Sequence, residues 1–206
     1  MPESDPEISQ RTLGHYEQNA ASFWERTRGH DVGQNIAAML RHIEGQVPYR
    51  ILDFGCGPGR DLAALRALGH EAVGLEGCPS FVAMARGHSG CDVLQQDFQR
   101  LELPENRFDA IFANASLFHV PSGAIRRVIM ALSTSLKPSG VLFSSNPLGR
   151  DEEGWAGERY SVWHSEDGWR LLMGACGFVE LEHYYRPEGL PRDQQSWFAS
   201  VWRKRQ

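Results

Sequence analysis

The sequence lacks any apolar stretch that approaches the roughly 20 residues needed to span a bilayer, so we expect no membrane-spanning segment. Its start, which reads Met1-Pro-Glu-Ser-Asp-Pro6, is acidic and does not lead into the apolar region of a secretory signal. We therefore expect a cytoplasmic protein that has no membrane partner.

Paired cysteines are also absent. The four cysteines are widely spaced, form no C-x-x-C pair, and stand at Cys56, Cys78, Cys91 and Cys176. This spacing argues against a disulfide framework and against a zinc site, so we expect free thiols and no bound metal ion.

Basic residues form no run longer than Arg203-Lys204-Arg205, and the formal net charge is −5. A nucleic-acid-binding protein usually presents a basic face, so we expect no nucleic-acid partner. A chain of 206 residues suits one domain with its own core. Composition leaves the oligomeric state open between a monomer and a homodimer.

Short apolar runs alternate with helical patterns from Tyr49 onward. Strands that alternate with helices of this length require crossover connections, which predict a mainly parallel sheet covered on both faces. We expect an α/β fold with a doubly wound, seven-stranded sheet whose last strand is antiparallel. The expected strands lie at 50–54, 71–76, 92–94, 108–113, 141–145, 178–185 and 197–203, and the expected helices at 16–26, 35–44, 62–68, 79–87, 123–136 and 166–175.

The most informative segment is the glycine loop Leu52-Asp-Phe-Gly-Cys-Gly-Pro-Gly-Arg-Asp61. Glycines at 55, 57 and 59 allow a tight turn and a close approach to a ligand, because no Cβ is in the way. The helix that follows offers free N–H groups at its N-terminus. Dinucleotide-binding loops favour G-x-G-x-x-G, whereas this loop reads G-x-G-x-G with Arg60 at the position of the last glycine.

The segment Asp53–Gly59 resembles the first motif of the class I (Rossmann-like) S-adenosylmethionine (SAM)-dependent methyltransferases. The resemblance implies that SAM is the cofactor, that Glu76 holds its ribose hydroxyls, and that Asp97 and Phe98 hold its adenine. Taken singly, Glu76 also fits a surface carboxylate and Asp97 a turn residue. The full set of implied cofactor-binding residues is Asp53, Gly55, Cys56, Gly57, Gly59, Arg60, Asp61, Glu76, Gly77, Asp97, Phe98, Asn114 and Ala115.

The resemblance also implies a division of the chain into a helical lid segment at 1–48 and a SAM-binding methyltransferase domain at 49–206, within one structural domain. In the lid segment, Tyr16 is a candidate for the acceptor site, although aromatic residues at helical spacing also suit a core. His119 follows the fourth predicted strand by one loop and either orients the acceptor or bonds to the backbone.

An aromatic and polar insertion at 146–164 adds Tyr160 and His164 as candidate catalytic residues. Amphipathic rings with polar tips suit a small ligand, so this insertion either lines an acceptor pocket or forms a surface loop held by its aromatic residues.

The motif that amino-methylating nucleic-acid enzymes carry after the fourth strand is absent, because the position reads Asn114-Ala-Ser-Leu117. We therefore expect a methyltransferase that acts on nitrogen, sulfur or oxygen of a small-molecule substrate. Two alternatives stay open at this point. One is a SAM-binding protein without catalysis, and the other is an NAD-dependent oxidoreductase.

Overall fold

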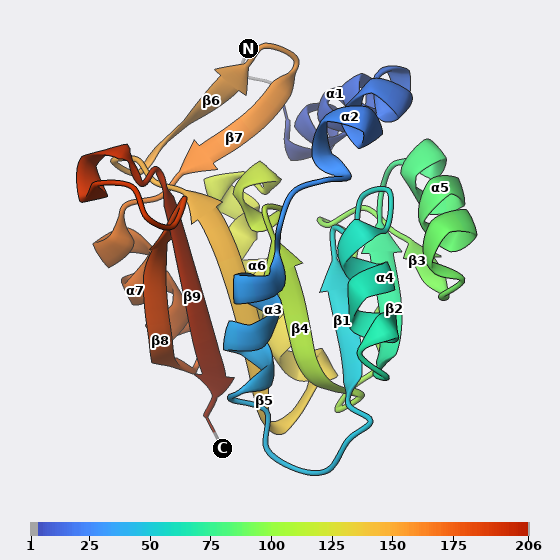
Figure 1. Ribbon diagram of the computed structural model, residues 1–206. Helices are drawn as coiled ribbons and strands as arrows, with labels where there is room; N and C mark the ends of the chain where they lie inside the picture. Colours follow the sequence, from blue (N-terminus) through green and yellow to red (C-terminus); the bar gives the residue numbers. More distant parts are fainter. Residues whose placement is uncertain (1–3, 206) are drawn as a thin grey trace.

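The computed structural model describes residues 4–205, which form a seven-stranded sheet with helices on both faces (Figure 1). The strand order is β3-β2-β1-β4-β5-β9-β8. The bounds of these strands are β1 (Arg50–Phe54), β2 (Glu71–Glu76), β3 (Val93–Gln95), β4 (Phe108–Asn114), β5 (Leu136–Pro147), β8 (Phe178–Arg186) and β9 (Trp197–Lys204).

Neighbouring strands from β3 to β5 pair in parallel, and β9 is antiparallel to both β5 and β8. The predicted fold class, including the antiparallel last strand, is therefore confirmed. The chain first builds outward from β1 to β3 and then returns to place β4 on the other side of β1. Ile51 consequently lies opposite Ala72 of β2 and Ala110 of β4. Such a reversal of strand order leaves a crevice at the carboxyl ends of the two central strands.

Side chains on each strand alternate between two cores. Ile51 faces α3 (Gly33–Leu40) and α4 (Arg60–Ala67), and α5 (Pro79–Ser89) packs beside α4. Leu52 and Phe54 face the opposite core, which contains α6 (Ser122–Ser135) and α7 (Glu166–Ala175). Across residues 4–205, no helix combines the length and the apolar character that a membrane crossing requires.

The N-terminal region differs from the two helices predicted at 16–26 and 35–44. It contains α1 (Asp5–Gln18), α2 (Ala20–Thr27) and the shorter α3, and a break at Asn19 separates the first two. The backbone N–H of Ser4 donates to the Glu7 carboxylate at 2.8 Å, which is one half of a capping box. The sequence pattern Ser4-x-x-Glu7 therefore marks the start of α1, which the helical periodicity alone did not reveal.

The three N-terminal helices occupy two different places. Ile36 and Met39 of α3 are buried against Phe112 and Phe143 of the sheet, so α3 contributes to the domain core. In contrast, α1 and α2 lie over the carboxyl ends of the central strands (Figure 1). Within the predicted lid segment, therefore, α1 and α2 lie over the ends of the strands, whereas α3 does not.

A second, two-stranded sheet was not predicted. In the insertion that reads as a loop, β6 (Glu152–Ala156) pairs with β7 (Arg159–Trp163) as an antiparallel hairpin. The turn between them uses Gly157, whose φ of 65° suits glycine. Apolar and polar residues do not alternate strictly here, because the hairpin packs on α1 and on a short 3-10 helix, η1 (Leu117–His119), and not on the main core.

The position of α3 in the core predicts the effect of truncating one of its side chains. Met39→Ala should lower the free energy of unfolding by about 2–5 kcal/mol, because the side chain is fully buried. Met130→Ala, at an exposed position of α6, is the matched control and should change it by no more than about 0.5 kcal/mol. Urea denaturation measures both, and equal effects would contradict the assignment of α3 to the core.

Candidate functional site

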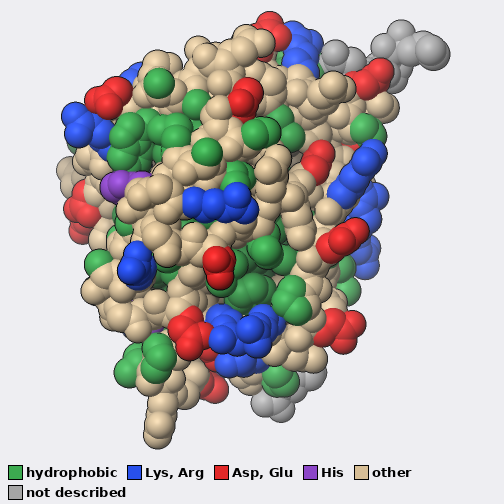
Figure 2. All heavy atoms as spheres, turned by 90° about the vertical axis from the view of Figure 1, so that its right-hand side faces the viewer, with side chains coloured by type: hydrophobic (Ala, Val, Ile, Leu, Met, Phe, Trp, Pro, Cys, Tyr) green, Lys and Arg blue, Asp and Glu red, His purple; other side chains and the backbone are tan. Residues whose placement is uncertain are grey.

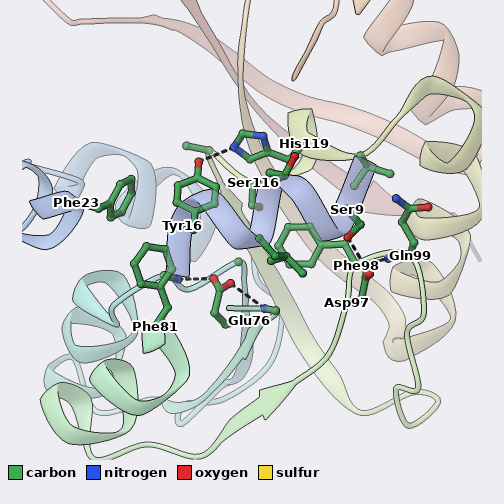
Figure 3. Close-up of a pocket in the computed structure, with 17 residues that line it drawn as sticks. Ser9, Tyr16, Phe23, Glu76, Phe81, Asp97, Phe98, Gln99, Ser116 and His119 are labelled. Carbon is green, nitrogen blue, oxygen red and sulfur yellow. Dashed lines mark hydrogen bonds between the residues drawn. The ribbon is translucent and has the colours of Figure 1, made fainter. Parts of the chain in front are cut away.

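The main cavity lies where the carboxyl ends of β1, β2 and β4 meet α1 (Figure 3). It comprises about 670 Å³ of empty space, including the part open to solvent. Ser9, Asp97 and Gln99 form a polar end on one side. Tyr16, Phe23, Phe81 and His119 form an aromatic end on the other, and Glu76 lies below and between them.

The floor of the cavity is the glycine loop. Gly59 has a φ of 92°, and a Cβ placed on it would lie 2.7 Å from the Cα of Ala85 on α5. Gly55 has a φ of 75°, and a Cβ there would collide with the side chain of Ser116. Glycine is therefore required at both positions, because the loop takes a left-handed conformation and also passes close to its neighbours.

The Glu76 carboxylate joins the glycine loop to the loop after β2. It accepts hydrogen bonds from the backbone N–H groups of Gly57 at 3.0 Å, Gly77 at 2.8 Å and Cys78 at 2.9 Å. Burial raises the pKa of Glu76, and these three N–H groups oppose the rise. The Glu76 side chain therefore lines the wall of the cavity, and its carboxylate holds the backbone of the glycine loop and of the loop after β2 in place.

A second cavity of about 570 Å³ adjoins the first, with which it shares Phe23, Gly55, Gly57 and Ala115. Arg60 lines it and donates to the Asp61 carboxylate at 2.6 Å and to the carbonyl oxygen of Thr27 at 2.8 Å. Its guanidinium therefore ties the end of α2 to the start of α4.

Asp61 is held from a second direction as well. The side-chain amide of Asn114 donates to Asp61 at 2.9 Å, and Asn35 of α3 donates in turn to the Asn114 oxygen at 3.0 Å. The hydroxyl of Tyr184 donates to Asn35 at 2.8 Å, so the polar chain continues to β8. Buried amides that are satisfied in this way hold a single orientation.

Buried acidic groups concentrate beneath the glycine loop. The Asp53 carboxyl is almost fully buried, and its Oδ2 atom has no hydrogen-bond partner among the described residues. Burial raises the pKa of Asp53 well above its usual range, and the nearby charge of Asp61 adds to the rise. With Asp61 and Glu76 also buried and Arg60 as their cationic neighbour, the region favours a positively charged ligand.

At the aromatic end, His119 makes two hydrogen bonds that define its tautomer. Its Nδ1 atom lies 2.6 Å from the carbonyl oxygen of Tyr160, which can only accept, so Nδ1 carries the proton. Its Nε2 atom lies 2.8 Å from the Tyr16 hydroxyl and accepts from it. Burial lowers the pKa of His119 to about 4, which keeps the ring neutral near pH 7.

The structure separates the predicted site residues into three groups. The main cavity brings together Tyr16, Gly55, Gly57, Glu76, Gly77, Asp97, Phe98, Ala115 and His119, and the second cavity adds Cys56, Arg60, Asp61 and Asn114. Asp53, Gly59, Tyr160 and His164 line neither of these two cavities.

The two candidates from the insertion therefore have other positions than the ones expected. The ring of His164 is buried against Trp169, with centroids 4.9 Å apart. Tyr160 turns its ring toward Trp155 of the hairpin and contributes only its backbone to the site, through the carbonyl that contacts His119. A hydrogen bond from its N–H to Thr12, 3.1 Å long, attaches the hairpin to α1.

Five residues that line the main cavity were not predicted from the sequence, namely Ser9, Thr12, Phe81, Gln99 and Ser116. Ser9, Thr12 and Tyr16 stand three, four and seven positions apart, a spacing that places all of them on one face of a helix. That spacing could have identified the face if the helix had been predicted to begin at Asp5. No local signal marks Phe81 or Gln99, which the fold brings to the cavity from α5 and from the loop after β3.

Residues 51–140 match the family described as a methyltransferase domain. A ubiquinone biosynthesis O-methyltransferase of Nitrosococcus oceani is 28% identical over 200 residues, which cover 92% of this chain and 81% of that protein. A trans-aconitate 2-methyltransferase of Methylobacterium nodulans is 35% identical over 131 residues, which cover 62% of this chain and 47% of that protein.

The fold is also similar to that of solved methyltransferases. The 1,6-didemethyltoxoflavin N1-methyltransferase of Burkholderia thailandensis, which holds its substrate and S-adenosylhomocysteine, superposes with a TM-score of 0.82 at 18% identity. The alignment covers 100% of this chain and 92% of that one. This likeness concerns the fold.

The buried carboxyl of Asp53 predicts a pH-dependent stability. Its pKa is higher in the folded than in the unfolded chain, so the folded state binds more protons and stability falls as the pH rises through the folded pKa. Asp53→Asn should therefore lose less stability between about pH 5 and about pH 8 than the wild type does. Urea denaturation of the ligand-free protein at both pH values measures the difference.

Asp92→Asn, at an exposed position before β3, is the control and should leave the pH dependence unchanged. The same pH dependence in wild type and Asp53→Asn would show that the Asp53 carboxyl does not titrate in this range.

Proposed function

We propose that this chain, which belongs to the class I SAM-dependent methyltransferases, transfers the methyl group of SAM to an oxygen atom of a small, flat molecule. The observation that carries the proposal is the unprotonated Nε2 of His119 at the aromatic end of the cavity, because a hydroxyl acceptor must lose its proton. The N. oceani relative is named an O-methyltransferase, which supports the same choice of atom.

The charges of the site fit SAM. SAM carries a sulfonium and an ammonium, and the buried carboxyls of Glu76 in the main cavity and Asp61 in the second cavity favour cations. NAD carries an anionic pyrophosphate, which the same carboxyls would repel. The hydroxyl of Ser116, which lines the main cavity and has no hydrogen-bond partner among residues 4–205, also suits a ligand that supplies a hydrogen-bond donor.

In the proposed arrangement, the nucleoside of SAM lies at the polar end of the main cavity. Glu76 accepts hydrogen bonds from the ribose hydroxyls, and Asp97 accepts one from the adenine amino group, beside the ring of Phe98. The amino-acid part extends along the glycine loop into the second cavity. There Arg60 and Asp61 offer charges opposite to those of a carboxylate and an ammonium group.

SAM supplies an activated methyl group, so the task of the protein is to hold an acceptor atom in line with the methyl carbon. Orientation of this kind lowers a barrier by about 7–11 kcal/mol in favourable cases. Tyr16, Phe23, Phe81 and His119 surround the space beyond the glycine loop with rings, which suits a planar acceptor. The same rings exclude water from the reacting atoms.

The first two helices are proposed to act as the lid. Ser9 of α1 donates to Asp97 at 2.8 Å, and Glu17 accepts from the hydroxyl of Ser80 at 2.6 Å on the far side of the cavity. These contacts fasten α1 over the cavity, and in the proposed mechanism α1 moves to admit the cofactor. Figure 2 shows basic side chains interspersed with acidic ones on one face of the molecule, a distribution that suits a small-molecule substrate better than a nucleic acid.

Removal of the Glu76 carboxylate should weaken cofactor binding. Glu76→Ala should reduce the affinity for S-adenosylhomocysteine by about 1–3 kcal/mol, because a buried hydrogen-bond acceptor is lost. Calorimetric titration measures the affinity, with NAD as the ligand that should not bind. Glu71→Ala, at the exposed start of β2, is the matched control and should bind as the wild type does.

Because the carboxylate also holds the loops, Glu76→Gln provides a second variant that keeps the shape of the side chain. Unchanged affinity in folded protein would mean that the ribose does not contact this residue. Binding of NAD in place of S-adenosylhomocysteine would contradict the cofactor arrangement as a whole.

The choice of oxygen as the acceptor atom predicts the outcome of a screen. With SAM and equal concentrations of catechol, thiophenol and aniline, the protein should form the O-methyl product of catechol in excess over the other two products. Mass spectrometry of the products measures the ratio. Faster methylation of sulfur or nitrogen would contradict the proposed acceptor and leave the methyltransferase assignment in place.

A further inference from the structure

We propose that Tyr16 is the residue that takes the proton from the acceptor hydroxyl and relays it to His119. This inference rests on the proposed transfer to oxygen and names the side chain that contacts the reacting hydroxyl. It assigns a catalytic residue to the lid helix, so that the complete site forms only when α1 covers the cavity.

The relay follows from the direction of three hydrogen-bonding groups, two of which, the Tyr16 hydroxyl and the His119 ring, are seen in Figure 3. The Tyr160 carbonyl fixes the His119 proton on Nδ1, at a distance of 2.6 Å. The lone pair of Nε2 therefore faces the Tyr16 hydroxyl, 2.8 Å away, and accepts its proton. A phenolic oxygen that donates its proton keeps lone pairs with which it can accept another one.

An acceptor hydroxyl has no direct access to Nε2 in this arrangement, because Tyr16 occupies that position. Tyr16 itself lines the cavity between Phe23, Phe81 and His119, and each of these rings has its centroid 5.5 or 5.6 Å from the Tyr16 ring. A planar acceptor at the aromatic end would therefore meet the Tyr16 oxygen before it could reach Nε2 of His119.

The proposed step moves two protons and one methyl group. The acceptor O–H gives its proton to Oη of Tyr16 while the original Tyr16 proton passes to Nε2 of His119. The acceptor oxygen bonds to the methyl carbon, and sulfur keeps the electron pair of the bond that breaks. The positive charge leaves the sulfur and is regained on the imidazolium, so the net charge of the cavity does not change. Conservation of charge matters because charge creation is costly in a water-poor site.

Neighbouring charged groups set the proton affinity of this pair. Burial raises the pKa of Tyr16, and a side-chain hydrogen bond with Arg159 on β7, together with the Arg159 positive charge, opposes the rise. The Arg159 charge and burial both lower the pKa of His119, while its hydrogen bond to Tyr160 raises it. Glu76 and Cys78 also face Tyr16 and raise its pKa. A base of this weakness suits an acidic, phenol-type hydroxyl better than an aliphatic alcohol.

The test uses two acceptors that differ in whether a proton must be removed. Catechol is neutral at about pH 8, whereas 4-nitrocatechol is already ionised there. Tyr16→Phe and His119→Asn should each lower kcat on catechol by at least about 100-fold and leave kcat on 4-nitrocatechol within a few fold, with little change in KM. The asparagine variant keeps a donor for the Tyr160 carbonyl but lacks Nε2.

Tyr185→Phe is the matched control, because it removes a tyrosine hydroxyl that donates to Glu166 at 2.8 Å outside the cavity. It should leave both rates unchanged. Equal losses on the two acceptors in Tyr16→Phe would assign Tyr16 a structural role and overturn the relay, while transfer to oxygen would stand. A wild type that methylates neither acceptor would overturn the proposed hydroxyl acceptor and the relay together.

A readout that needs no turnover is nitrogen NMR of histidine-labelled protein. The relay requires a neutral His119 with the proton on Nδ1, and the Nε2 signal should shift in Tyr16→Phe as the hydrogen bond is lost. The His119→Asn spectrum identifies the signal. A proton on Nε2 in the free protein would overturn the relay whatever the kinetics.

Discussion

Three backbone N–H groups converge on the buried carboxylate of Glu76, and the shape of the site depends on this contact. Gly57 belongs to the glycine loop after β1, and Gly77 and Cys78 belong to the loop after β2. The two loops lie on either side of one cavity because backbone N–H groups of both loops donate to the same Glu76 carboxylate. Buried backbone N–H groups are costly when unpaired, so the carboxylate stabilises the loops as well as the wall of the cavity.

The electrostatics of the site follow from the burial of several carboxyl groups near Glu76. Asp53, Asp61 and Glu76 are buried close together with Arg60 as their neighbour, an arrangement that costs stability in the free protein. A cationic cofactor compensates for this cost when it binds. In the proposed arrangement, the carboxyls would discriminate by charge in favour of SAM and against the anionic pyrophosphate of a dinucleotide.

Two segments outside the main sheet complete the aromatic end. Helix α1 supplies Tyr16, and the hairpin β6–β7 supplies the Tyr160 carbonyl that orients His119. A further hydrogen bond between Thr12 and the Tyr160 N–H joins the hairpin to α1. In the proposed relay, the proton-accepting group is assembled from three parts of the chain, and a movement of α1 that opened the cavity would also separate Tyr16 from His119.

Local sequence patterns were sufficient for the sheet, for α4 to α7 and for the glycine loop, because strand periodicity, helix caps and the need for positive φ at Gly55 and Gly59 act over a few residues. The pairing of Tyr16 with His119 joins positions 103 residues apart, and the hairpin contributes a backbone carbonyl, which any residue type could supply. The sequence by itself therefore determined the seven-stranded sheet with its flanking helices α4 to α7 and the glycine loop. Only the tertiary structure decided which candidate site residues meet at the aromatic end, because hydrogen bonds between segments far apart in the chain produce no periodic pattern in the sequence.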